Sequence, residues 1–424
     1  MRKNIYDKDL GYDILKPIID WNLKHSYQKL EVKGKENIPT DGAVIVAPNH
    51  CNTLMDALVI LRAFNDETVF GARADMFNNA LIAKFMYFIR ILPMVRQRDG
   101  LRNVLKNYET QDIIVNTLKH KVRFCIFPEG RHRPAHSLQV LGKGIFRAAL
   151  AANASFGEQM PVYILPAGIE YGDYFRYRST SLVTFGKPIN VTETIKELNL
   201  DNEAQIMDQL RKELTARMSE LITYLPYDEN YDAKWALTKV RALDFKGSLY
   251  DKMMNNRAIV SEINAACESD PDKMNEVLAD ASAFEKARRK KGISIYSFRK
   301  KNLALSVVAK GLAALLGLPY LIFSGVVALP MWVIAEFLRK NIRDKAFRNT
   351  AIFGVKLAGN IIFGLTYLIL AFCLLPWTWA LCFLALAAPA YSYIYDYAEF
   401  VRRWISDIKL LGNKKLQKDF ASLY

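Results

Sequence analysis

Cysteine is scarce in this chain and shows no paired spacing. The 424 residues contain five cysteines, at positions 51, 125, 267, 373 and 382. The last two lie in strongly apolar sequence. We therefore predict neither a disulfide framework nor a zinc site, and we expect a reduced soluble part that faces the cytoplasm.

Two further features are missing from the sequence. The first residues include Arg2, Lys3 and Asp7 and lack an apolar core, so we expect no signal peptide. No Gly-x-Ser-x-Gly motif occurs, and no serine or cysteine has an obvious neighbouring base except Cys51, which follows His50. The sequence therefore gives no reason to expect a covalent nucleophile.

Positive charge is in excess. The chain has 58 Lys and Arg against 43 Asp and Glu, a formal net charge of +15. Such an excess favours an anionic partner: lipid headgroups, a phosphorylated substrate or nucleic acid. The basic clusters flank apolar runs instead of alternating with surface aromatics, so we expect a membrane partner and no nucleic acid.

A chain of this length is too long for one compact core. Its composition changes along the sequence, and we divide it into five segments. They are an N-terminal amphipathic helix (1–27), an α/β domain (28–225), a polar helical linker or subdomain (226–301), membrane-embedded helices (302–400) and a basic tail (401–424).

Short apolar runs alternate with helical patterns up to about residue 225. This alternation predicts an α/β fold with a mostly parallel sheet flanked by helices. The expected strands are 30–32, 44–47, 68–72, 122–127, 162–169 and 182–185, and the expected helices are 12–26, 54–64, 101–118, 142–152 and 201–225. Two segments stay open to two interpretations. The helix 12–26 is expected either to pack on its own domain or to lie on a membrane surface. The apolar segment 76–91 is expected either to belong to the core or to form the surface that admits an acyl chain from the bilayer.

The C-terminal half contains two long apolar runs, 303–338 and 357–393. Each is long for one membrane span and short for two, and each contains an internal proline, Pro319 or Pro376. We therefore predict two helical hairpins, spanning or re-entrant. Because basic residues flank both runs, we expect these flanks and the α/β domain on the cytoplasmic face.

Polar residues follow several of the expected strands. In α/β sheets ligands bind outside the carboxyl ends of the strands, so these residues are expected to face one crevice. They are His50 and Asp56; Arg96 and Arg98; Glu129 and Gly130; and Pro166 to Gly168. A histidine held by a carboxylate can deprotonate a hydroxyl, and arginines bind phosphate. The set is suited to acylating a phosphorylated alcohol from a thioester, with backbone N–H groups near Gly130 or Gly168 as candidate oxyanion donors.

Each of these residues also has a structural interpretation. Thr53 and Asp56 fit a capping box at a helix start, and Glu129 can bond neighbouring backbone only. Lys143, at an expected helix start, contacts the acceptor or is simply solvated. Four further residues are expected to form a basic rim facing lipid or phosphate: Arg131, His132, Arg133 and His136.

The same residues resemble those of the glycerolipid acyltransferases that contain an Asn-His-x(4)-Asp block. The matching segments are Asn49-His50…Asp56, Pro93…Arg96-x-Arg98, Phe127-Pro-Glu-Gly130 and Val162-Tyr-Ile-Leu-Pro166, and Gly142-Lys-Gly144 and Phe185-Gly-Lys-Pro188 also fit. The resemblance covers roughly residues 28–225. One departure is that five residues, not four, separate His50 from Asp56, a spacing similar to the branch that acylates glycerol 3-phosphate or dihydroxyacetone phosphate and carries C-terminal membrane segments.

The resemblance implies acyl transfer from acyl-CoA or acyl carrier protein, as co-substrate and without a further cofactor. The acceptor is glycerol 3-phosphate or 1-acylglycerol 3-phosphate, in phospholipid biosynthesis. His50 would be the base and Asp56 its orienting partner. The acceptor would be held by Arg96, Arg98, Glu129, Gly130, Arg131, Lys143 and Pro166. Two alternatives remain: an acyltransferase that remodels lysophospholipids, and a non-catalytic lipid-binding protein with the same fold.

Overall fold

The computed structural model describes residues 4–64, 66–94, 104–198, 202–299 and 302–424. The chain forms two compact units. Unit 1 comprises residues 1–24, 29–174 and 180–222, and unit 2 comprises residues 25–28, 175–179 and 223–424. The chain thus enters unit 2 twice in short loops before its C-terminal half joins that unit.

Unit 1 is built on a sheet of eight strands among the described residues. They are β1 (Lys29–Lys33), β2 (Ala43–Pro48), β3 (Thr68–Arg73), β4 (Ile91–Met94), β5 (Arg123–Cys125), β6 (Val162–Tyr171), β7 (Thr180–Phe185) and β8 (Ile189–Asn190). The order is β1-β7-β6-β2-β5-β3-β4, with β8 paired to β6. The five strands from β6 to β4 are parallel, whereas β7 and β8 run antiparallel to β6. The predicted α/β class with a mostly parallel sheet is confirmed.

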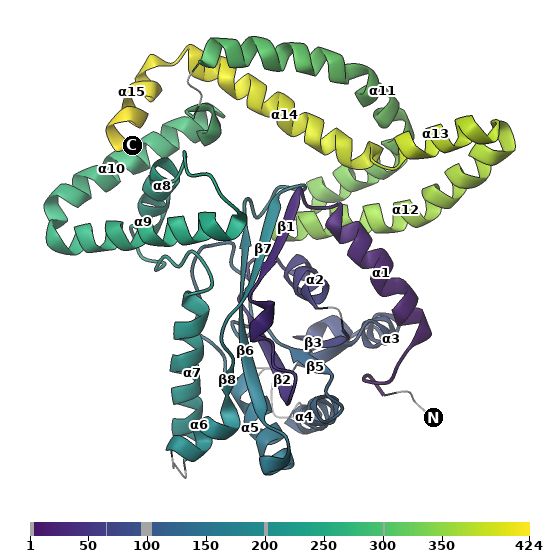
Figure 1. Cartoon of the computed structure of the whole chain (residues 1–424), viewed down its shortest axis with the longest axis vertical. Helices are drawn as coiled ribbons and strands as arrows, with labels where there is room; N and C mark the ends of the chain where they lie inside the picture. Colours follow the sequence, from purple (N-terminus) through teal and green to yellow (C-terminus); the bar gives the residue numbers. More distant parts are fainter. Residues whose placement is uncertain (1–3, 65, 95–103, 199–201, 300–301) are drawn as a thin grey trace. The chain divides into compact units, whose positions relative to one another are not determined.

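Helices cover both faces of this sheet (Figure 1). Those of unit 1 are α1 (Leu10–Lys24), α2 (Leu54–Ala63), α3 (Ala80–Phe88), α4 (Val104–Lys119), α5 (Gly144–Phe156), α6 (Val191–Leu198) and α7 (Glu203–Ser219). Side chains alternate along a strand. Ala43, Ile45 and Ala47 of β2 accordingly pack in one core with α4, α5 and α7, and the residues between them face the side of α2.

The structure differs from the sequence prediction at two places in unit 1. The apolar segment 76–91 is not one element, because it contains α3 and leads into β4, a strand that the sequence pattern did not indicate. Strand β6 continues to Tyr171, beyond the expected end near Ile169. It can do so because β7 pairs with its second half, from Ala167 to Tyr171.

Unit 2 begins with a helical subdomain of α8 (Tyr231–Arg241), α9 (Leu249–Ser269) and α10 (Pro271–Lys290). The C-terminal helix α15 (Lys414–Leu423) packs on it, and Leu416 and Leu423 are buried in the same core. Ser248 and Asp251 form a capping box that starts α9. The predicted polar subdomain and the basic tail therefore share one hydrophobic core.

A buried carboxylate, Glu285, joins α8 to α10. It accepts from Lys239 at 2.5 Å, from Arg288 at 2.8 and 2.9 Å and from Arg289 at 2.7 Å. Burial by itself would raise the pKa of Glu285, but the hydrogen bonds and charges of Arg288 and Lys239 outweigh it and lower the pKa to about 2. Burial lowers the pKa of Lys239, although the negative charge of Glu285 opposes the shift. Glu285 faces three cations and stays charged.

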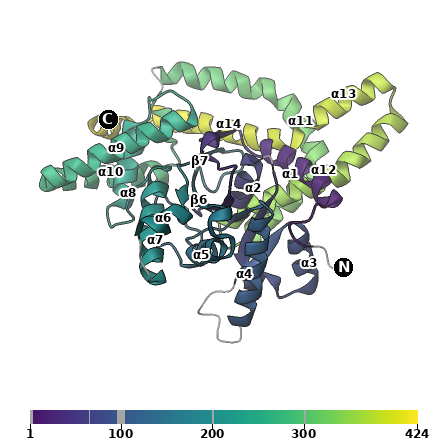
Figure 2. The ribbon, with the colours of Figure 1, turned by 60° about the horizontal axis from the view of Figure 1, so that its bottom comes forward.

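The remaining helices of unit 2 are α11 (Leu303–Asn341), α12 (Ala346–Leu374), α13 (Trp377–Ala387) and α14 (Ala390–Leu411). Helices α11 and α12 are long and apolar enough to cross a membrane. Helices α13 and α14 are bent by 44° relative to each other and would make a third span if the two together count as one span. Helix α11 runs alongside α14 (Figures 1 and 2).

The prediction of two hairpins holds for one apolar run only. The second run breaks at Pro376, between α12 and α13, as expected. The first run does not fold back, because Leu303–Asn341 is one helix with Pro319 and Pro330 inside it. A proline removes one backbone hydrogen bond and bends a helix, and packing against neighbouring helices keeps such a helix continuous.

Candidate active site

His50 lies in the loop that follows β2, next to α2. Its Nδ1 is 2.8 Å from Oδ2 of Asp56, a carboxylate in the first turn of α2 with no exposed surface. The extra residue between them is taken up by the loop, so the pair forms despite the longer spacing. The side chain of His50 is 18% exposed, and its Nε2 makes no hydrogen bond to any residue that the structure describes.

Asp56 is held by several donors at once. Its Oδ2 also accepts the backbone N–H groups of Cys51 (2.8 Å) and Asn52 (2.7 Å), and its Oδ1 accepts the hydroxyl of Tyr171 (2.8 Å). These donors fix the position of the carboxylate beside His50. The alternative role as a capping box is wrong, since Thr53 makes no side-chain cap bond and Asp56 bonds the N–H groups of the His50 loop instead.

Because Oδ2 of Asp56 already accepts two backbone N–H groups, it can only act as an acceptor toward His50. The proton on the imidazole is therefore assigned to Nδ1, which leaves the lone pair on Nε2. This is the tautomer that a general base requires. The pair can take a proton from a bound hydroxyl and stabilise the imidazolium that results.

Two residues that position the pair were not identified as such from the sequence. Asn49 bonds β6 twice, accepting from Ile169 N at 2.6 Å and donating to Ile169 O at 3.1 Å, which fixes the loop to the sheet. Tyr171 reaches Asp56 from the end of β6. Asn49 is part of the motif that singles out His50, but Tyr171 is far from it in sequence, and its only signal is its place at a strand end.

The turn after β5 forms the second wall of the site. The ring of Phe127 stacks on His50 with centroids 4.4 Å apart, and Oε1 of Glu129 accepts the backbone N–H of His50 at 2.9 Å. Oε2 of Glu129 accepts from the backbone and side chain of Gln139, at 3.1 and 3.0 Å. Burial raises the pKa of Glu129 above its usual value, although these N–H groups oppose the shift. Glu129 was expected either to contact the substrate or to bond neighbouring backbone. These contacts favour the second interpretation.

Gly130, Gly168 and Pro166, which the sequence suggested as substrate contacts, pack against or bond other parts of unit 1. The N–H of Gly130 donates to Phe127 O at 3.1 Å, and its φ of 66° favours glycine at this turn, so this N–H is not a free oxyanion donor. Gly168 is inside β6, where a Cβ would lie 2.2 Å from Leu221 O. Pro166 is buried in the middle of β6, opposite Ala47, and not at the carboxyl end of the strand.

Basic groups surround the turn. Arg131 is exposed and donates to Gln139 Oε1, while Arg133 is held by Ser137 and its N–H bonds the carbonyl of His50. Helix α5 starts beside the turn, since Gly142 N donates to Pro128 O at 2.7 Å, and Lys143 is exposed at that start. The partial positive charge of a helix N-terminus adds to that of Lys143.

His132 and His136 complete the predicted rim. His132 lies edge-on to His50 with centroids 5.8 Å apart, whereas His136 is buried and faces Glu170 at 3.5 Å. His132 therefore adjoins His50, whereas His136 faces a carboxylate of β6. Arg96 and Arg98, the predicted phosphate ligands, lie outside the described residues.

Cys51 follows His50 but is not placed as a nucleophile. It is buried, and its thiol points to Asp56 Oδ1 at 3.7 Å and Ile169 O at 3.9 Å. Burial and the charge of Asp56 raise the pKa of this thiol well above its usual value. A neutral, buried thiol supports the loop and leaves direct attack by a substrate hydroxyl as the chemistry that fits.

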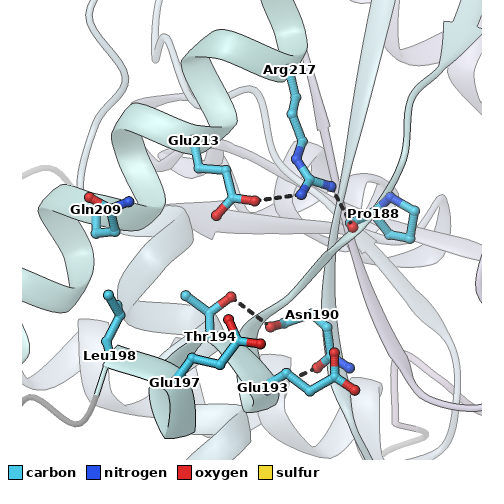
Figure 3. Close-up of a pocket in the computed structure, with 9 residues that line it drawn as sticks. All are labelled: Pro188, Asn190, Glu193, Thr194, Glu197, Leu198, Gln209, Glu213 and Arg217. Atoms are coloured by element: carbon cyan, nitrogen blue, oxygen red, sulfur yellow. Dashed lines mark hydrogen bonds and ion pairs between the residues drawn. The ribbon is translucent and has the colours of Figure 1, made fainter.

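A separate hollow of about 290 Å³ lies between α6, α7 and β8 (Figure 3). Its charged residues are Glu193, Glu197, Glu213 and Arg217, and Arg217 is occupied by Glu213 and the carbonyls of Lys187 and Pro188. Strand β8 pairs with the start of β6, at Tyr163 and Ile164, so this hollow is at the opposite edge of the sheet from His50. Its negative charge makes it unsuitable for a phosphate.

Comparison with known proteins places a function class on this domain. Residues 29–170 match the family model described as acyltransferase. The chain is similar to glycerol-3-phosphate O-acyltransferase 2 of Saccharomyces cerevisiae, with 27% identity over 139 residues, 33% of this chain and 18% of that protein's length. It is also similar to the crystal structure of the 1-acyl-sn-glycerophosphate acyltransferase PlsC of Thermotoga maritima, with 19% identity, 52% of this chain and 83% of that chain covered, and a TM-score of 0.36. The expected resemblance to acyltransferases is confirmed for residues 29–170, the segment that the family model matches, and this chain spans less than a fifth of the length of the yeast protein.

Proposed function

We propose that this chain, with its acyltransferase domain at residues 29–170, acylates a hydroxyl of a glycerophosphate. The acceptor is glycerol 3-phosphate or 1-acylglycerol 3-phosphate, and the donor is an acyl thioester of coenzyme A or acyl carrier protein. The observation that carries the proposal is the pair of His50 and fully buried Asp56, joined at 2.8 Å with Nε2 of His50 unoccupied by described residues.

The reaction needs one base and no covalent enzyme intermediate. Nε2 of His50 takes the proton of the acceptor hydroxyl while the hydroxyl oxygen attacks the thioester carbonyl carbon. The carbonyl then re-forms as the carbon–sulfur bond breaks, and the thiolate leaves and takes up the proton from His50. Asp56 stabilises the imidazolium between these steps, and general base catalysis of this kind contributes about 10²–10⁴-fold.

The phosphate of the acceptor would bind on the basic side of the site. Arg131 and Lys143 are exposed there, beside the turn that contacts His50 and the start of α5. The sequence adds Arg96 and Arg98 as the bidentate ligands. Arginine suits this role because its fork matches two phosphate oxygens.

An apolar surface of unit 1 supports access from lipid. Leu10, Ile14, Ile18 and Trp21 lie along one exposed face of α1, at helical spacing. Helix α3 exposes Leu81, Ile82, Phe85 and Phe88, and the ring of Phe88 adjoins Gly11 of α1. Exposed apolar patches next to basic residues are typical of membrane contact. We propose that this face meets the bilayer on its cytoplasmic side, the side that the basic flanks of α11 and α12 favour.

The test is acceptor profiling with the full chain in detergent. Glycerol 3-phosphate, 1-acylglycerol 3-phosphate and a lysophosphatidylcholine are each offered with labelled acyl-CoA and acyl carrier protein. We expect transfer to a glycerophosphate and a loss of at least about 100-fold in kcat for His50→Ala. His120→Ala, an exposed histidine of the same unit bonded to Asn116 O, is the matched control.

Two outcomes would contradict the proposal. If no acceptor is acylated, or if His50→Ala is as active as His120→Ala, the chain is not an acyltransferase of this mechanism. If only the lysophosphatidylcholine is acylated, the chain remodels existing lipid. The phosphate assignment is checked with Arg96→Ala, which should raise the KM of the acceptor more than that of the donor.

A further inference from the structure

The connection between β5 and α5, residues 126–143, has no regular secondary structure. A connection of this length inside a compact domain is uncommon unless it has a function or is packed by its own side chains. Its middle part, residues 131–139, contains Arg131, His132 and Arg133, and we call it the basic loop. Residues 135–137 of the basic loop are buried, so the loop turns back into unit 1 there.

Side chains within the basic loop hold it together. Gln139 donates to Arg131 O at 2.8 Å and accepts from Nε of Arg131 at 2.8 Å. The guanidinium of Arg133 donates to Ser137 Oγ and to Leu138 O, both at 3.0 Å. These bonds close the loop on itself, so a contact at one of its residues helps to fix the others.

Two contacts attach the basic loop to neighbouring segments. The N–H of Arg133 donates to His50 O at 2.9 Å, which places the loop beside the candidate base. Nδ1 of His136 lies 3.5 Å from Oε1 of Glu170 in β6, and only 8% and 13% of the two side chains is exposed. A carboxylate that is removed from water needs a cation or a donor, so Glu170 favours His136 at this place.

The contact of His136 is separate from the one that supports the candidate base. Glu170 directly precedes Tyr171, the residue whose hydroxyl bonds Asp56. Successive side chains of a strand point to opposite faces, and β6 pairs with β7 without a break over residues 167–171. The side chain of Glu170 therefore points away from that of Tyr171. Loss of the contact to His136 should leave the bond between Tyr171 and Asp56 in place.

We propose that His136 is a positioning residue for the acceptor. Its contact with Glu170 fixes the basic loop, and the loop sets where Arg131 and His132 lie beside His50. Arg131 is exposed, and His132 lies edge-on to His50 with ring centroids 5.8 Å apart. The inference rests on the proposed function, because the group that these basic side chains would bind is the phosphate of the acceptor.

Steady-state acyl transfer by the full chain separates this role from a catalytic one. His136→Leu keeps a similar volume and removes the nitrogen that faces Glu170. We expect the acceptor KM to rise at least about fivefold, whereas kcat and the donor KM stay within about twofold of the wild type. His136→Asn carries an amide nitrogen at the place of Nδ1, so it should restore most of the acceptor affinity.

A variant at Glu170 tests whether the two residues act through one contact. Glu170→Met removes the carboxylate and should raise the acceptor KM to a similar extent. The double variant His136→Leu/Glu170→Met should be no worse than the worse single variant, because only one contact is lost. Thermal unfolding checks that each variant folds. The double variant leaves no charged member of the pair buried alone, so it carries the test if His136→Leu does not fold.

Hydrogen exchange followed by mass spectrometry examines the loop without any substrate. Peptides that cover residues 131–139 should exchange faster in His136→Leu than in the wild type, because the loop opens locally more often. His120→Leu is the matched control, since it replaces an exposed histidine of the same unit that bonds Asn116 O. This control should change neither the exchange of the loop nor the acceptor KM.

The outcomes separate this inference from the proposed function. If the wild type acylates a glycerophosphate but His136→Leu has an unaltered acceptor KM, or loses kcat instead, only this inference is wrong. It is also wrong if the loop exchanges at the same rate in His136→Leu and His120→Leu. If the wild type acylates no glycerophosphate, the proposed function is wrong, and the exchange rates decide whether His136 holds the loop.

Discussion

Asp56→Asn tests the proposal that His50 acts as a general base supported by a buried carboxylate. The substitution keeps the shape of the side chain and removes its charge. Oδ2 of Asp56 faces three N–H donors, so the asparagine oxygen must take that place. Its NH₂ group then replaces Oδ1, where the hydroxyl of Tyr171 can rotate and accept instead of donating. The orientation and tautomer of His50 should therefore survive, and only the electrostatic support is lost.

The size of that loss follows from Coulomb's law. The imidazolium and the carboxylate are separated by about 4 Å between charge centres, which at an effective dielectric constant of about 20 gives roughly 4 kcal/mol. At 1.36 kcal/mol for each factor of ten, kcat should fall about 10³-fold. The KM of the acceptor should change little, because Asp56 is buried behind His50 and touches no substrate.

Tyr171→Phe is the companion variant. It removes one donor from Asp56 but leaves the charge, so kcat should fall by less than about tenfold while the unfolding free energy falls by about 1.5–3 kcal/mol. The assay is steady-state acyl transfer by the full chain, with thermal unfolding measured in parallel. If folded Asp56→Asn keeps kcat within about tenfold of the wild type, or if Tyr171→Phe loses as much, the electrostatic account is refuted.

Two further predictions concern Glu129 and Glu285. Glu129→Ala removes the acceptor of the His50 backbone N–H, so kcat should fall and the unfolding free energy should drop by about 1–3 kcal/mol, whereas a rise confined to the acceptor KM would show direct contact with the substrate. The pKa of Glu285 is lowered from 4.5 to about 2, so its contribution is complete above about pH 4.5 and is lost as the pH falls toward 2; thermal unfolding should show at most about 3 kcal/mol lost over that range, and less in Glu285→Gln. An equal acid loss in both proteins would contradict this account.

Much of the fold could be predicted because its signals are local. The apolar run of β2 is fully buried as expected, and the periodic pattern from Leu54 gives α2 almost to the residue. Strand β4 and the continuous α11 were missed for a shared reason. Whether Ile91–Met94 becomes a strand depends on β3 beside it, and whether a helix continues through Pro319 depends on the helices packed around it.

The chemistry of the site was only half visible in the sequence. His50 and Asp56 stand out because they lie only six residues apart, one in the loop after β2 and the other in the first turn of α2. Pro166 also stood out, but it lies inside β6, because the length of a strand is set by its partner β7 and not by its own residues. The basic groups Arg131 and Lys143 are exposed, Arg131 in the turn after β5 and Lys143 at the start of α5.

The sequence by itself determined the residue types, the order of the elements and the choice of His50 and Asp56 as the candidate base and its partner. Only the tertiary structure decided which groups hold that pair. Tyr171 bonds Asp56 across 115 residues of sequence, and Glu129 bonds His50 across 79. Hydrogen bonds act over about 3 Å of space. Which distant groups come that close is fixed by the order in which β2, β5 and β6 lie side by side, and no local pattern encodes that order.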